Sequence, residues 1–123
     1  MDFASIGTDE LVNILDKYEK NGDIKSVKEI YKILNNRDVE SCFWKELFYE
    51  GTEWQIKLAA SIKKPLGIYE VSLIQSDELF EKIMKKYDVC MDGVKMVLDD
   101  LKLEPLGCFK YNFIKKFIKK NYH

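Results

Sequence analysis

The tripeptide Pro-Leu-Gly occurs at residues 65–67 and again, 40 residues later, at residues 105–107. In each copy, a segment with helical spacing precedes the proline, and an apolar, aromatic run follows the glycine. A fixed period near 40 residues is typical of stacked two-helix units, because each unit buries its apolar face against the next. The repeat therefore predicts a mostly α-helical fold of antiparallel hairpins.

Helical periodicity and stop signals divide the chain into about six or seven helices. Gly22 ends the first predicted helix, since glycine readily adopts the left-handed conformation, and Asp23 caps the second. We expect a single helical domain of residues 1–123, because this length suits one domain. Its predicted parts are hairpins at about 8–35, 38–64 and 77–104, followed by a basic amphipathic C-terminal segment at 109–123.

The turn of the first hairpin, residues 21–27, resembles the turn between the two helices of tetratricopeptide-like repeats. The resemblance covers one hairpin, and the repeat's full signature of small and aromatic positions does not accompany it. It implies paired antiparallel helices in this part of the chain and carries no implication for function.

Residues 66–74 are the one segment with strand character, and residues 107–112 are a second candidate strand. Residues 66–74 are rich in β-branched and aromatic side chains with low helix preference, and residues 107–112 begin at the glycine of the second tripeptide. We expect at most a small two-stranded element made by these two segments. The end of the chain permits two interpretations: a short strand at 107–112 followed by a helix, or one helix from Lys110 onward.

Composition and cysteine usage limit the environment of the chain. The net charge is −1 and hydrophobic residues make up 46%, which is typical of a folded globular protein. No apolar run approaches the ~18 residues that a membrane span requires, and residues 1–3 begin no targeting segment. Cys42, Cys90 and Cys108 are odd in number and unpaired in spacing, which favours free thiols in a reducing compartment. We expect a cytoplasmic or nuclear protein with no membrane span.

Residues that usually carry catalysis are scarce. The single histidine is the last residue, His123, so mechanisms that use an imidazole base have no candidate. The glycines are isolated, and scattered cysteines do not supply a zinc site. Asp88, Asp92, Asp99 and Asp100 lack the spacing of a calcium loop and suit helix caps or a solvated face. We predict a non-enzymatic protein with no catalytic residue, no metal site and no cofactor.

Residues 113–120 read Phe-Ile-Lys-Lys-Phe-Ile-Lys-Lys. In a helix the apolar residues form one stripe and the lysines the opposite side. The stripe is expected to dock on the last hairpin, because helical repeats need a terminal cap. A lysine face beside aromatic rings could also hold a nucleic-acid backbone, lie on an anionic membrane, or fill a partner's groove. The candidate binding residues of the C-terminal segment 109–123 are Lys110, Tyr111, Lys115, Lys116, Lys119 and Lys120.

The predicted helix at 38–49 is the most aromatic stretch of the chain. Phe43 pairs with Leu47 and Trp44 with Phe48 at i,i+4 spacing, so the apolar surface is wider than one stripe. Either this helix is central and covered on two sides, or part of it is a binding surface. The candidate binding residues are Trp44, Phe48 and Tyr49, although aromatic residues at helical spacing more often form core.

Three functions follow from these patterns. The main hypothesis is a non-enzymatic protein–protein interaction module or small adaptor or regulatory subunit, whose partner is another protein. The first alternative is a nucleic-acid-associated protein that binds the phosphate backbone through its lysine and aromatic C-terminal segment. The second is a self-associating, homo-oligomeric structural or regulatory factor. A winged-helix reader of DNA is disfavoured, because the would-be recognition helix at 92–103 carries several acids that repel phosphate.

Overall fold

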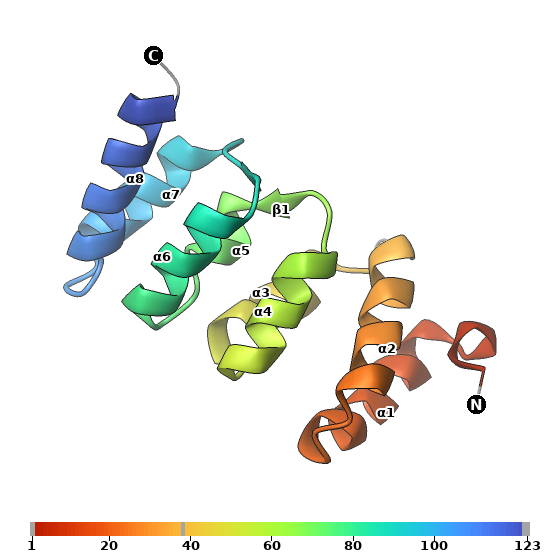
Figure 1. The fold of residues 1–123 in the computed structure, drawn as a ribbon. Coiled ribbons are helices and arrows are strands. Elements are labelled where there is room, and N and C mark those ends of the chain that lie inside the picture. The colour runs from red at the N-terminus through yellow and green to blue at the C-terminus, as the bar shows by residue number, and fades with distance from the viewer. Residues whose placement is uncertain (1, 38, 122–123) are drawn as a thin grey trace. The chain divides into compact units, whose positions relative to one another are not determined.

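The computed structural model describes residues 2–37 and 39–121 of the 123-residue chain. These residues form eight α-helices, one short 3-10 helix and one pair of two-residue strands (Figure 1). The predicted mostly helical class with a small β element is therefore confirmed. The described residues divide into two compact units: those up to Leu47 together with 51–64, and those of 48–50 together with 65 onward. The single-domain organisation stays a prediction.

The first unit is built around helix α2, which packs against both α1 and α4. The turn between α1 and α2 follows the prediction: Gly22 has a φ of 68°, and the Asp23 carboxylate accepts a hydrogen bond from the Ser26 amide at 3.2 Å. The unit contains η1 (Phe3–Ser5), α1 (Thr8–Lys20), α2 (Ile24–Asn36), most of α3 (Ser41–Glu50) and α4 (Glu53–Ile62). Its buried apolar side chains include Leu11, Leu15, Val27, Ile30, Leu34, Trp44, Ile56 and Ala59.

A polar network joins three helices of this unit. The Tyr31 hydroxyl donates a hydrogen bond to the Glu19 carboxylate at 2.7 Å, and the Gln55 amide donates to the same oxygen at 2.9 Å. The Gln55 side chain also accepts from the Thr52 amide at 2.8 Å, which completes the capping box of α4. Burial is the main cause that raises the pKa of Glu19, while the Tyr31 hydrogen bond opposes it. The network therefore ties α1, α2 and α4 together at a carboxylate that is costly to keep charged.

Arg37, the sole arginine of the chain, holds the N-terminal segment to the end of α2. Its guanidinium donates to the carbonyl oxygens of Ile6 at 2.7 Å and Ala4 at 2.9 Å, and to the Thr8 hydroxyl at 3.3 Å. A planar guanidinium directs several donors at once, which a single ammonium group does not. The one arginine in a lysine-rich chain thus has a structural role. The helix predicted at 38–49 begins at Ser41, because Val39 and Glu40 are not helical, and Asp38 lies outside the described residues.

The second unit places a small sheet beside four helices. Its elements are β1 (Leu66–Gly67), α5 (Ile68–Val71), α6 (Asp77–Lys86), β2 (Val89–Cys90), α7 (Val94–Leu103) and α8 (Cys108–Asn121), together with the last turn of α3. Helix α8 packs against both α6 and α7, and α5 contacts α6, α7 and both strands. The core of the unit therefore forms where α5 and α8 meet α6 and α7.

The position of the sheet corrects one prediction. Strand β1 pairs in parallel with β2, with Leu66 opposite Val89 and Gly67 opposite Cys90, and residues 107–112 supply no strand. Residues 68–71 are helical, and α8 begins at Cys108, so the interpretation with one continuous terminal helix describes the end of the chain. The extended run needed for a winged-helix arrangement is accordingly helical. The second Pro-Leu-Gly leads directly into helix α8, where the prediction placed an extended segment.

The two copies of Pro-Leu-Gly share a backbone role and differ in the burial of their leucine. Each glycine directly precedes a helix, and a side chain there would meet the Leu101 carbonyl at Gly107 and the Glu70 carboxylate at Gly67. Leu66, however, is 4% exposed in the sheet, whereas Leu106 is 89% exposed in the turn before α8. The repeat thus marks two equivalent helix starts within different surroundings.

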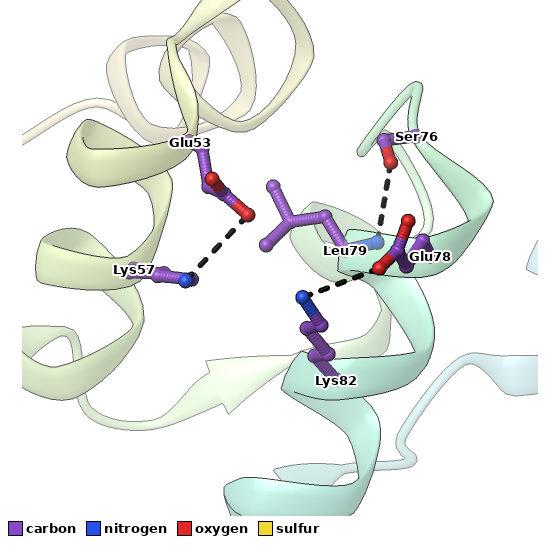
Figure 2. A network of polar contacts seen from close by, with 6 residues as sticks. All are labelled: Glu53, Lys57, Ser76, Glu78, Leu79 and Lys82. Atoms are coloured by element: carbon purple, nitrogen blue, oxygen red, sulfur yellow. Dashed lines mark hydrogen bonds and ion pairs between the residues drawn. The ribbon is translucent and has the colours of Figure 1, made fainter.

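A helix cap and exposed ion pairs stabilise individual helices. The Ser76 hydroxyl caps α6 by accepting from the Leu79 amide at 3.2 Å, as Figure 2 shows. The same figure draws i,i+4 ion pairs within α4, between Glu53 and Lys57 at 3.5 Å, and within α6, between Glu78 and Lys82 at 3.4 Å. Such exposed pairs each contribute only about 0.3–0.5 kcal/mol. They favour the helices locally, and the apolar core supplies the packing.

We expect the variant Glu19→Gln to remove one source of pH dependence from the first unit. The pKa of Glu19 is raised from its ordinary 4.5, so the folded state binds more protons than the unfolded state above that pH. The free energy of unfolding should therefore fall as pH rises from 4.5 through the raised pKa. In urea unfolding across this window, the free energy of unfolding of the variant should rise relative to that of the parent as the pH increases. Glu29→Gln, which alters an exposed carboxylate of α2, is the control, and a pH-independent difference would contradict the assignment.

We expect Arg37→Lys to loosen the N-terminal segment. The lysine ammonium cannot reach the Ala4 and Ile6 carbonyl oxygens together, so the change should cost about 1–2 kcal/mol locally. Hydrogen exchange of residues 3–8 should accelerate by roughly one order of magnitude, since 1.4 kcal/mol corresponds to a factor of ten. Lys28→Arg, on the exposed side of the same helix, should leave the exchange unchanged. Unaltered exchange in Arg37→Lys would refute the role of the guanidinium.

Candidate functional site

Helix α8 carries the basic aromatic sequence and has two different apolar edges. Ile114 is fully buried, so this position docks the helix onto the unit, as predicted for the stripe. Phe109, Phe113 and Phe117 lie four residues apart, and their rings stack in a column with centroids 6.2 and 6.4 Å apart. Phe113 also meets the buried Phe80 of α6 edge-on at 5.5 Å. The column is therefore anchored to α6 at its centre.

An open groove lies alongside this column, between α6 and α8. Its volume is about 820 Å³. The side chains that line it come from the two helices and from the residue that ends α6: Glu81, Met84, Lys85, Tyr87, Phe109, Asn112, Phe113, Lys116, Phe117 and Lys120. Phenylalanine, methionine and tyrosine form its apolar part, and charged groups stand at its edges. A concave apolar surface with a few polar groups is the usual form of a binding site.

The charge at the groove is predominantly positive. Lys85, Lys116 and Lys120 contribute three cations, while Glu81 contributes the one carboxylate among the lining residues. Glu81 lies 3.6 Å from Lys85 on the same helix, so its charge is already shared with that lysine. The cations on the α8 side, Lys116 and Lys120, therefore set the potential that an incoming ligand meets.

The four predicted lysines in the last turns of α8 separate into two pairs. Lys116 and Lys120 line the groove, whereas Lys115 and Lys119 are exposed on α8 outside the lining. The Lys115 ammonium lies 5.9 Å from the centre of the Tyr111 ring, which places that half-buried tyrosine away from the groove as well. The sequence alone predicts that Lys115, Lys116, Lys119 and Lys120 share one face of the helix.

Lys110 departs from the predicted surface role. Its ammonium donates a hydrogen bond to the Ser72 carbonyl oxygen at 3.0 Å and lies 5.8 Å from the centre of the Phe80 ring. Burial lowers the pKa of Lys110, and the carboxylates of Asp77 and Glu104 oppose that shift. The side chain therefore fastens α8 to the segment after α5. It is a structural cation rather than an outward-facing one.

The aromatic candidates of α3 are mostly core. Trp44 is 3% exposed and contacts the Tyr31 ring edge-on at a centroid distance of 6.0 Å, and Phe48 is fully buried. Tyr49 is 52% exposed, and its carbonyl oxygen accepts a hydrogen bond from the Gln75 amide at 2.9 Å. Of the two interpretations of this helix, the covered one therefore describes Trp44 and Phe48. Only Tyr49 among the three presents its side chain to solvent.

Metal-ligating side chains and thiols are the other candidate reactive groups in the described part of the chain. No group of three or more His, Cys, Asp or Glu side chains there could hold a metal ion. Cys42 and Cys108 are exposed and Cys90 is partly exposed, all three as free thiols. Tyr122 and His123, including the only histidine, lie outside the described residues. Within residues 2–37 and 39–121, no helix has the length and apolarity needed to cross a membrane.

Sequence reasoning missed most of the groove, since only Lys116 and Lys120 among its lining residues were predicted as binding residues. It assigned no binding role to Glu81, Met84, Lys85 or Tyr87, because the meeting of α6 with α8 depends on packing between distant segments. A usable signal was present on α8, where phenylalanine recurs at every fourth position from 109 to 117. That spacing places the rings in one column along a helix, distinct from the isoleucines beside them.

Comparison of the chain with protein-family models, with curated proteins and with solved structures finds no match.

Proposed function

We propose that this chain is a non-enzymatic protein-interaction module that binds another protein in the groove between α6 and α8. The observation that carries the proposal is the column of Phe109, Phe113 and Phe117 along an open groove of about 820 Å³. Aromatic and methionine side chains are enriched at the centres of protein interfaces, where a charged rim surrounds them. The lining of this groove has that composition.

The chemistry of the lining supports binding rather than catalysis. Among the residues that line the groove, the ionisable groups are one carboxylate, three lysines and a tyrosine, with no Ser, Thr, Cys or His. A nucleophile held by an adjacent base, the usual arrangement for covalent catalysis, has no counterpart in this set. The groove exposes apolar side chains of phenylalanine and methionine. Burial of apolar area is the main source of affinity in protein association.

A nucleic-acid partner is the second candidate, and one observation favours it. Lys115 and Lys119 extend the positive charge of α8 beyond the groove, so one helix carries four exposed lysines in its last turns. Such a row could follow a phosphate backbone. The phenylalanine rings, however, already stack on one another with interplanar angles of 25° and 20°, which leaves fewer ring faces for bases. The groove therefore supports a protein partner better.

Site-specific photo-cross-linking tests the proposal. A benzophenone amino acid placed at Asn112, an exposed residue of the lining, should give a discrete adduct with another protein in extract of the source cells. The same amino acid at Lys119, on α8 but outside the lining, is the matched control and should give little or none of that adduct. A groove-restricted adduct is expected because only the first position lies in the docking surface.

The other hypotheses predict different products. A nuclease-sensitive adduct that forms as well from residue 119 as from residue 112 would favour the nucleic-acid alternative. A product of twice the 14.5 kDa chain mass would favour self-association. Equal protein cross-linking from both positions, or none from either, would refute docking in the groove.

A further inference from the structure

We propose that the occupant of the groove is an acidic amphipathic α-helix of the partner protein, with apolar side chains along one face and Asp or Glu beside them. The inference rests on the proposed docking function and adds the conformation and the charge of the docked segment. Three properties of the groove carry it: the length of its apolar floor, the nature of its walls and the charge of its rim.

The apolar floor has the length of a short helix. Phe109 and Phe117 are two helical turns apart, about 12 Å at 1.5 Å per residue. A partner helix presents apolar side chains at positions i, i+3 or i+4, and i+7 over that same distance. The ring column of α8 and Met84 of α6 therefore offer a row of contacts that matches the spacing of three such side chains.

The walls of the groove favour a helix over an extended peptide. An extended peptide gains much of its affinity by pairing its backbone with a free sheet edge. The sheet in the described part of the chain is the β1–β2 pair, and none of its residues lines the groove. The lining consists of side chains from two helices and Tyr87, which supply no ladder of backbone donors and acceptors. A helix satisfies its own backbone hydrogen bonds and needs only side-chain contacts.

The rim sets the charge of the occupant. Lys116 and Lys120 stand one turn apart on α8, and Lys85 stands on α6 with the single acid Glu81 3.6 Å from it. Acidic side chains flanking the apolar face of a partner helix would lie opposite these lysines, while basic side chains would be repelled. Because the rim is exposed, the attraction should weaken as salt is raised from 50 to 500 mM, on the scale set by the Debye length.

The test is selection from a displayed library of random 16-residue peptides, with no bias toward any secondary structure, on the purified full chain. Selected peptides are then titrated by fluorescence anisotropy against the parent and two charge-reversed pairs. Lys116→Glu with Lys120→Glu should weaken binding by about tenfold or more, because two attractive contacts become repulsive. Lys115→Glu with Lys119→Glu makes the same change in net charge on the same helix, outside the groove, and should weaken binding by no more than about threefold.

A second matched pair examines the apolar floor without reversing any charge. Phe109→Ala removes a groove ring that is 41% exposed, and should weaken binding by about five- to twentyfold. Leu106→Ala removes an exposed apolar side chain that does not line the groove, and should leave binding unchanged. Circular dichroism and thermal unfolding of all four variants establish that each is folded.

The outcomes separate this inference from the function on which it rests. Selected peptides with apolar residues at helical spacing and flanking acids, sensitive to the groove variants, support the inference. Neutral or basic peptides that still depend on Phe109 would overturn the acidic helix while leaving protein docking intact. An enrichment of extended or proline-rich peptides would overturn the helical occupant, and a failure to enrich any peptide would overturn the inference altogether. A groove-dependent dimer in sedimentation equilibrium would instead identify a second copy as the occupant.

Discussion

The docking of α8 through Ile114 is the contact on which the candidate site depends. Because this side chain is fully buried, the rotation of α8 about its own axis is fixed, and with it the position of every other residue on that helix. The phenylalanines then lie at the edge of the docked face, where Phe113 meets Phe80 and its two neighbours continue the column. A different rotation of α8 about its axis would move both the phenylalanine column and the lysines away from their present positions.

The cations of the chain divide between structural and surface tasks according to their burial. Arg37 and Lys110 both direct their donors at backbone carbonyl oxygens and hold a terminal segment or a helix in place. The lysines further along α8 remain exposed. An exposed ammonium keeps its hydration and its long-range field, which suits recognition, whereas a partly buried one needs fixed acceptors to offset its lost hydration. Residue type alone does not distinguish these tasks.

Much of the fold could be predicted from local patterns. Gly22 and Asp23 marked the first hairpin turn, and the mostly helical class followed from the 40-residue period. The error concerned the partner of Leu66 in the sheet, which is Val89 rather than a residue of 107–112. Strand pairing joins distant segments, and a pair of two-residue strands leaves almost no alternation to read in the sequence.

For the candidate site, the sequence by itself determined that α8 is amphipathic, that phenylalanine recurs along it every fourth residue, and that its lysines are concentrated at its end. These properties depend only on helical geometry. Tertiary structure alone decided that α6 would form the opposite wall, that Lys110 would face inward, and that Lys116 and Lys120 would border a groove while Lys115 and Lys119 would not. The physical reason is that the angular position of α8 is set by the packing of its buried side chains against α6 and α7, which no local pattern encodes.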